Sequence, residues 1–244
     1  EKIASYALTE PGSGSDAAAL KTSAVKDGDH YVLNGTKQFI SGSGYNDVYV
    51  VMARTGDHKS KGISCFVVEK GTPGMTVERL DKKMGIRASD TAVLRFDGCR
   101  IPKDNLLGDA EIQPKRGFAG AMQTFDNTRP MVAAMAVGVA RASLERAGEI
   151  LAERGVQVSY GGHPDAGSAL EAELVRMEAE LEAARLLMLK AAWMADDARP
   201  NSMEASMAKA FATEMAMRVA ASAMQVLGLH GQLEEGSRGT PLKG

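Results

Sequence analysis

The sequence has little cysteine, and the scarcity excludes two classes of site. Its 244 residues include two cysteines, Cys65 and Cys99, and four histidines. Two cysteines cannot build a disulfide framework or a zinc site, and the scattered histidines show no metal-ligand spacing. Both cysteines lie in strand-like runs, so we expect them to be small core side chains. No metal site is predicted.

Net charge and long apolar runs are also lacking. A formal net charge of −2 gives no basic surface for nucleic acid or for an anionic membrane. No apolar run is long enough to span a bilayer, and no signal peptide is recognisable. We therefore expect no nucleic-acid partner, no membrane span and a cytoplasmic location. Glu1 stands close to the first motif and Gly244 ends a tail rich in glycine and charge, so we expect both ends to be cut.

The first part of the chain has the period of β-structure. Short runs rich in β-branched and aromatic residues are separated by turn residues, near residues 31–33, 37–41, 47–53, 63–68, 75–80 and 91–96. Asn34-Gly35, between the first two runs, predicts a hairpin. Spacing of this kind predicts an antiparallel β-sandwich or barrel over residues 1–110.

From about Gly117 the apolar period becomes helical. A first helix is expected to bury Val132, Met135 and Val139 on a stripe that continues to Leu151. A second helix predicts a helix–helix seam, because its apolar residues alternate at spacings of four and three. These residues are Leu170, Leu174, Met177, Leu181, Ala184, Met188 and Ala191.

A third helix is expected to begin after Pro200. Asn201 is its predicted N-cap with Glu204 at the third helical position, and Gly228 is its predicted end. Three helices with short connections predict an antiparallel bundle over residues 111–244. The expected fold class is therefore α+β, with a β-sandwich or barrel domain followed by a helical bundle.

One turn of unusual composition precedes the strands. Residues 6–16 read Tyr-Ala-Leu-Thr-Glu-Pro-Gly-Ser-Gly-Ser-Asp. Pro11 fixes its own φ, while Gly12 and Gly14 permit positive φ and close approach of a ligand. With its hydroxyls and free N–H groups, such a turn suits an anion or a flat polar ring. An ordinary surface turn is the alternative on composition alone.

This turn resembles the flavin-binding segment of acyl-CoA dehydrogenases, Tyr-x-x-Thr-Glu-Pro-x-x-Gly-Ser-Asp. Four later motifs follow in that family's order, at residues 34–41, 84–91, 125–130 and 225–231. The third of them resembles the Phe-Asp-x-Thr-Arg-Pro of medium-chain-type members. The family order is a helical domain, a β domain and a helical bundle. The resemblance implies that this chain holds the β domain and most of the bundle, without the first helical domain.

The resemblance also implies FAD as cofactor and a set of contacts to it. These carry over to Tyr6, Leu8, Thr9, Gly14, Ser15, Phe39, Ile40, Ser41, Arg154, Gln225 and Gly228. Phe39 would lie against the isoalloxazine ring and Ser41 beside its reactive N5. The alternative places Phe39 in the sheet core and Ser41 at the start of a turn. The family's Arg-x-x-Phe-Gly spacing is stretched after Arg154, and Leu229 replaces a glycine.

Substrate contacts carry over to Ser15, Asp126 and Arg129. Ser15 would touch the CoA part, while the helical pair would contact the pantetheine and the acyl-CoA. An exposed helical ion pair is the alternative for Asp126 and Arg129. Arg87 and Asp90 are expected to anchor a turn.

No catalytic residue is assigned within this chain. The family's usual base is a Glu in a Tyr-Glu-Gly-Thr-like segment well beyond the Gln225 motif, and the chain stops before it. Glu235-Gly236-Ser237 imitates that segment, but Glu235 lies only ten residues past Gln225. Thr128 stands where some relatives carry the base as Glu, and threonine cannot serve. We expect this segment alone to be inactive.

The resemblance implies α,β-dehydrogenation of an acyl-CoA thioester to the 2-enoyl-CoA, as in lipid degradation. A Glu base would remove the α-proton while hydride passes to flavin N5, and electrons would then reach an electron-transfer flavoprotein. The implied assembly is a homo- or hetero-tetramer. Three alternatives stay open: a non-catalytic FAD-binding subunit of a heteromeric enzyme, an acyl-CoA oxidase, and a cofactor-free oligomerisation module. The acyl group (fatty, branched or steroid side chain) is undetermined.

Overall fold

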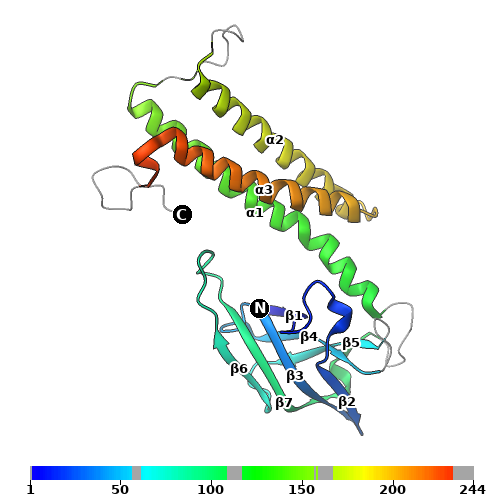
Figure 1. Ribbon diagram of the computed structural model, residues 1–244. Helices are drawn as coiled ribbons and strands as arrows, with labels where there is room; N and C mark the ends of the chain where they lie inside the picture. The colour runs from blue at the N-terminus through cyan, green and yellow to red at the C-terminus, as the bar shows by residue number, and fades with distance from the viewer. Residues whose placement is uncertain (1, 57–61, 109–116, 157, 159–166, 233–244) are drawn as a thin grey trace. The chain divides into compact units, whose positions relative to one another are not determined.

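The computed structural model describes residues 2–56, 62–108, 117–156, 158 and 167–232 (Figure 1). The chain divides into two compact units, Glu1–Ala121 and Met122–Gly244. The described strands all belong to the first unit, and the long helices belong to the second apart from the start of α1. A domain boundary at residue 110 falls among residues outside the described part of the chain.

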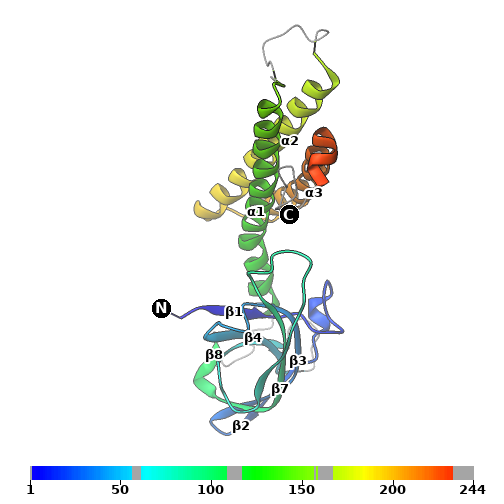
Figure 2. The same cartoon turned by 90° about the vertical axis from the view of Figure 1, so that its left-hand side faces the viewer.

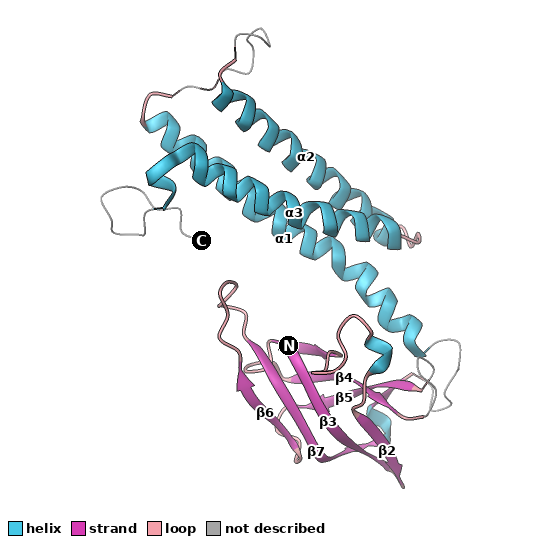
Figure 3. Cartoon of the chain, viewed as in Figure 1, coloured by secondary structure: helices cyan, strands magenta, loops and turns pink. Residues whose placement is uncertain are grey.

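The first unit is a mixed sheet of eight strands (Figure 3). Its strands are β1 (Ala4–Ala7), β2 (Ser23–Asp27), β3 (His30–Ser41), β4 (Val48–Arg54), β5 (Ile63–Glu69), β6 (Met75–Leu80), β7 (Thr91–Pro102) and β8 (Leu106–Leu107). Their order is β6-β7-β3-β2-β4-β5-β8, with β1 paired to β4. Two short 3₁₀ helices, η1 (Ala17–Ala19) and η2 (Lys103–Asn105), lie between strands.

The sandwich-like expectation for this unit is confirmed, with two corrections. The path of paired strands does not close, so the sheet is not a barrel. It is also not purely antiparallel, because β1 runs parallel to β4 and β2 meets β4 in one parallel pair. Strands β3 and β7, the longest, run antiparallel side by side (Figures 1 and 2). Strand β4 pairs with β1, β2 and β5, and it is largely buried.

Alternate residues of the strands form the core of this sheet. Tyr31 on β3 packs against Phe66 on β5 with ring centroids 4.9 Å apart. Cys99 is buried and Cys65 is half-buried, and both are free thiols. Burial raises the pKa of each thiol to about 11. Because thiolate is the reactive form, both cysteines are inert packing groups.

The hairpin predicted at Asn34-Gly35 is wrong. Strand β3 continues through these residues, and the turn between β2 and β3 lies instead at Gly28, whose φ is +58°. The register with β7 shifts between Leu33 and Gly35. A Cβ on Gly35 would lie 2.4 Å from Oγ1 of Thr22 and 2.7 Å from its Cα. Glycine is needed here for a close approach within the sheet rather than for a turn.

The second unit is a bundle of α1 (Gly117–Glu153), α2 (Ala169–Asp196) and α3 (Ser202–Leu227), followed by η4 (Gly228–Gln232). Helix α2 runs antiparallel to the other two (Figure 1). It begins in a capping box, where Ser168 Oγ accepts from Glu171 N at 3.1 Å and Ser168 N donates to Glu171 Oε2 at 2.7 Å. The predicted α2 seam is confirmed, because Leu174, Met177 and the other residues of that series join the bundle core.

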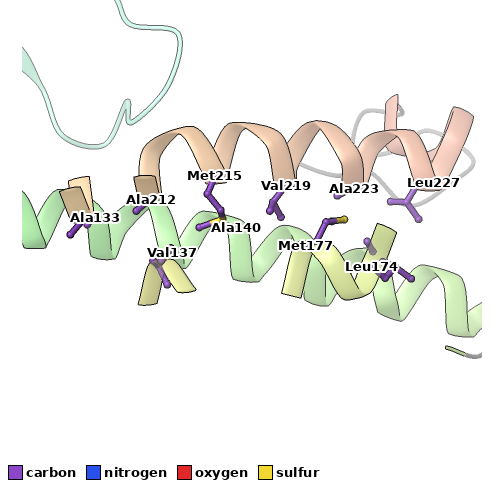
Figure 4. Packing of buried hydrophobic residues seen from close by; sticks show 14 of the residues in the cluster. Ala133, Val137, Ala140, Leu174, Met177, Ala212, Met215, Val219, Ala223 and Leu227 are labelled. Carbon is purple, nitrogen blue, oxygen red and sulfur yellow. The ribbon is translucent and has the colours of Figure 1, made fainter. Parts of the chain in front are cut away.

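Helix α3 starts and ends where expected. Asn201 is the N-cap, but its side chain donates to the carbonyl of Ala191 at 2.9 Å instead of capping its own helix. It thereby ties the end of α2 to the start of α3. Gly228, with φ +57°, is the C-cap. Met215 and Val219 of α3 point into the shared core (Figure 4).

The stripe predicted on α1 is wrong over its first half. Val132, Met135 and Val139 are 41%, 54% and 58% exposed. The buried face instead carries Ala133, Val137 and Ala140 (Figure 4), followed by Ala147, Ile150 and Leu151. Small alanines allow helices to approach closely, so packing selects the alanine face although its side chains are less apolar.

Candidate functional site

Residues 8–16 form a loop that leaves β1 and is fastened to β3. Gln38 N donates to the carbonyl of Thr9 at 2.8 Å. Within the loop, Glu10 and Ser13 exchange backbone hydrogen bonds of 2.9 and 3.1 Å. A Cβ on Gly12 or Gly14 would meet nothing within 4 Å. The loop is therefore fixed on its inner side, while its glycines face open space on the outer side.

Strand β3 carries a β-bulge beside this loop. Lys37 pairs with Leu94 and Ile40 pairs with Ala92 on β7. Two residues of β3, Gln38 and Phe39, therefore lie opposite one residue of β7, Val93. Phe39 takes φ +60°, which costs an aromatic residue about 1–2 kcal/mol. Bulges re-aim side chains, and here Phe39 is 62% exposed while Ile40 is buried. The alternative that Phe39 belongs to the sheet core is therefore wrong.

A buried ion pair joins the loop to the bulge. Lys37 Nζ lies 2.8 Å from Glu10 Oε1 and donates to the carbonyl of Leu8 at 2.9 Å. Glu10 also accepts from the backbone N–H groups of Lys21 at 2.6 Å and Thr22 at 2.9 Å. The side chain of Lys37 is wholly buried and that of Glu10 almost so. Three chain segments thus meet on one pair of charges.

Burial and charge act in opposite directions on this pair. Burial by itself would raise the pKa of the Glu10 carboxyl, but the Lys37 ammonium and the N–H donors outweigh it and hold the pKa below its ordinary value. Burial lowers the pKa of Lys37, and Glu10 opposes that shift. Neither residue is among the contacts that the sequence predicts. The available signal was a lysine on the inward face of a strand otherwise lined by Tyr31 and Leu33.

The turn after β3 holds Ser41 at the exposed end of the strand. The carbonyl of Ser41 accepts from Ser5 Oγ at 2.8 Å. Asp90 accepts from Gly42 N through its carbonyl at 3.0 Å and from Gly44 N through its carboxylate at 2.7 Å. Asp90 therefore anchors this turn as expected. Arg87 donates to the carbonyl of Lys83 at 3.2 Å, within the preceding turn.

The remaining candidates of the first unit divide by burial. Ser15 and Gly14 are exposed and Thr9 is half-buried, so these can meet a ligand. Leu8, at the start of the loop, and Ile40, on β3, are buried. Tyr6 is half-buried on β1, and burial, with a smaller contribution from Cys65, raises the pKa of its hydroxyl to about 12. The phenol therefore stays protonated at neutral pH.

Asp126 and Arg129 pair on α1 and are more than an exposed helical pair. Arg129 Nη1 lies 2.5 Å from Asp126 Oδ1, and both side chains are half-buried. Asp126 also accepts from Ser202 Oγ, at the start of α3, at 3.1 Å. The Arg129 guanidinium lies 6.0 Å from the centroid of the Phe125 ring. The carboxylate thus positions the arginine and links two helices.

The other candidates of the second unit gather elsewhere. Arg154 follows the end of α1, and Gln225 and Gly228 lie at the end of α3. Both helix ends are at the same end of the bundle (Figure 1). From residue 129 to residue 154 a helix rises roughly 37 Å, so Arg154 and Arg129 cannot bind the same small chemical group of a ligand. Glu235 lies outside the described residues.

Family models match both units in the order in which they occur. Residues 5–99 match the acyl-CoA dehydrogenase middle domain, and residues 115–241 match the acyl-CoA dehydrogenase C-terminal domain. The chain belongs to the acyl-CoA dehydrogenase family.

Individual relatives agree with this membership. The mitochondrial isobutyryl-CoA dehydrogenase of Bos taurus is 44% identical over 237 residues, which cover 96% of this chain and 55% of that protein. The mitochondrial short-chain specific acyl-CoA dehydrogenase of Mus musculus is 43% identical over 236 residues, covering 96% and 56%. The chain therefore spans about half the length of these relatives.

Solved structures show the same fold. The butyryl-CoA dehydrogenase of Megasphaera elsdenii superposes with a TM-score of 0.84 at 38% identity, covering 93% of this chain and 58% of that one. A chain from a structure of the electron transferring flavoprotein of Acidaminococcus fermentans superposes with a TM-score of 0.84 at 40% identity, covering 93% and 58%. In the described part of this chain, no helix is long and apolar enough to cross a membrane.

Proposed function

We propose that this chain is the part of an acyl-CoA dehydrogenase that holds the flavin ring and much of the thioester. The observation that carries the proposal is the exposed ring of Phe39, held at positive φ on a bulge beside the loop of residues 8–16. Backbone strain of this kind concentrates at ligand sites. Family membership supplies the chemical class of the ligand.

The residues present suit FAD. The Phe39 ring offers a flat apolar face, and the exposed Ser41 and half-buried Thr9 offer hydroxyl donors nearby on the same unit. Around Gly12 and Gly14 the loop is open, so a polar ring can approach its backbone closely. When bound, FAD supplies the acceptor for the β-hydrogen of the substrate as hydride.

The chain's own residues are proposed to cover, hydrogen-bond and support the bound ring. Phe39 covers the flavin and keeps water from the reacting atoms. Ser41 donates a hydrogen bond beside the reactive nitrogen, and the Tyr6–Ser15 segment lines the other contacts. In this proposal Leu8 and Ile40, being buried, act by supporting the exposed residues beside them.

Ser15 is proposed to contact the CoA part of the thioester, and Arg129 is proposed to contact its pantetheine and acyl part. One N–H of the guanidinium is engaged by Asp126, and the group has five, so donors remain for the pantetheine and acyl-CoA. Arg154, Gln225 and Gly228 are proposed to bind the adenosine diphosphate moiety of a neighbouring subunit's FAD. That role requires at least one neighbouring subunit, and we propose a homo- or hetero-tetramer.

The base that removes the α-proton is proposed to be a Glu outside these 244 residues, because the chain spans about half the length of its relatives. We further propose a short-chain acyl-CoA substrate, because relatives named for isobutyryl-CoA and for short chains align over nearly all of this chain. The proposed electron acceptor is an electron-transfer flavoprotein. The cytoplasmic location stays a prediction, and the two relatives above are mitochondrial.

The test uses the full-length protein that contains this chain. We expect about one FAD per chain after purification, anaerobic bleaching of the flavin by butyryl-CoA or isobutyryl-CoA, and weaker bleaching by long-chain thioesters. Electrons should then pass to an electron-transfer flavoprotein. Expressed alone, the 244-residue segment should reduce no electron acceptor.

Each other outcome selects a different function. Bound FAD that no acyl-CoA bleaches would identify a non-catalytic subunit of a heteromeric enzyme. Steady oxygen consumption with peroxide release would identify an acyl-CoA oxidase. A full-length protein that binds no flavin would leave the cofactor-free module and refute the proposal.

A further inference from the structure

The presence of a buried ion pair between Lys37 and Glu10 needs a physical explanation. Replacing a buried ion pair by apolar groups is often neutral or stabilising, because desolvating two charges costs as much as their attraction returns. Stability is therefore a weak reason for this pair. Its contacts suggest another reason, because beyond their bond to each other the two charged groups bind backbone groups, namely the carbonyl of Leu8 and the N–H groups of Lys21 and Thr22.

Those backbone groups belong to the three segments that surround the bulge. Lys37 binds the carbonyl of Leu8, at the start of the loop, and itself precedes the two bulged residues. Glu10 binds the N–H groups of Lys21 and Thr22, just before β2. Thr22 is also the residue against which Gly35 packs.

We propose that Lys37 and Glu10 are positioning residues that lock the loop of residues 8–16 to the β3 bulge and so set the orientation of the Phe39 ring toward its ligand. This inference rests on the proposed flavin function for the identity of that ligand. Neither side chain is accessible to a ligand, because both are buried. They act only through the backbone that presents Phe39, Thr9 and Ser41.

The test separates positioning from folding by removing both charges together. Lys37→Met alone leaves a buried carboxylate without its cation, so that variant can simply fail to fold. The double variant Lys37→Met, Glu10→Gln removes both charges with little change of volume. The matched control is Lys103→Met, Asp29→Asn, which removes an exposed pair of the same unit with a separation of 2.6 Å.

The first measurement needs no flavin. Full-length protein containing fluorinated phenylalanine gives a ¹⁹F resonance for Phe39, assigned by its loss in Phe39→Leu. We expect this resonance to shift or broaden in the Lys37/Glu10 double variant and to stay unchanged in the Lys103/Asp29 control. An unchanged Phe39 resonance in a folded double variant would overturn the inference.

The second measurement uses FAD added to apoprotein. Loss of the charge-assisted contacts that fix the loop should raise the Kd for FAD about tenfold in the double variant. The visible circular dichroism of the bound flavin should also change in the double variant. In the Lys103/Asp29 control, the Kd for FAD should stay within about twofold of the wild-type value. Equal affinity and spectrum in both variants would also overturn the inference. If wild-type protein binds no FAD, the proposed function fails, and the ¹⁹F result still decides the positioning role.

Discussion

Replacing Gly35 by alanine should destabilise the first unit far more than replacing Gly28. Both glycines have positive φ, +151° and +58°. Around Gly28 an added Cβ would meet nothing within 4 Å, so the cost there is the backbone strain alone, about 1–2 kcal/mol. Around Gly35 the added Cβ would lie 2.7 Å from the Cα of Thr22, which is backbone and cannot rotate away.

The expected cost at Gly35 therefore has two parts. Its backbone conformation costs a residue with Cβ about 1–3 kcal/mol, and forcing an extra methyl into the packed sheet adds about 1–3 kcal/mol. The sum is about 2–6 kcal/mol in the free energy of unfolding. Gly28→Ala is the matched control, because it makes the same chemical change in the turn that joins β2 to β3.

The assay is urea unfolding with two optical probes. Four of the five tyrosines lie in the first unit, so near-ultraviolet circular dichroism of tyrosine follows the sheet. The single tryptophan, Trp193, lies on α2, so its fluorescence follows the bundle. Gly35→Ala should lower the midpoint seen by tyrosine more than Gly28→Ala does. Equal loss in the two variants would refute the close-packing argument.

Two further predictions concern the bulge and the buried pair. Phe39→Gly should be more stable than Phe39→Ala by about 0.5–1 kcal/mol in urea unfolding, because only glycine takes φ +60° without strain. Equal stability of the two variants would argue against backbone strain at this position. Glu10 has a pKa below its ordinary 4.5, so its contribution to stability is complete above that pH and is lost as the pH falls through the lower folded value. Glu10→Gln should flatten the decline of the urea midpoint below pH 4.5, and a wild-type-like decline would contradict this assignment.

Local signals predicted much of the fold. The change from a short β period to a helical period near Gly117, the α2 seam and the end of α3 at Gly228 all match the structure. Each depends on residues close together in sequence, for which apolar spacing is a direct guide. The order of five motifs likewise indicated the family that the comparisons confirm.

Long-range contacts decided what those signals could not. Asn34-Gly35 reads locally as a hairpin, yet pairing with β7 and contact with Thr22 keep β3 extended there. On α1 the large residues Val132 and Met135 read as the buried face, yet close packing against other helices buries alanines instead. Both errors have one physical cause, since a local preference worth about 1 kcal/mol yields to the packing of whole elements.

The sequence by itself determined which residues carry the family's motifs and in which order they come. Only the tertiary structure decided how those motifs present a surface to a ligand. The bulge that exposes Phe39 depends on pairing with β7, and the loop beside it depends on a lysine and a glutamate 27 positions apart. Such a pair of charges is stable only when the fold buries it and supplies its backbone partners, and no local pattern reports that.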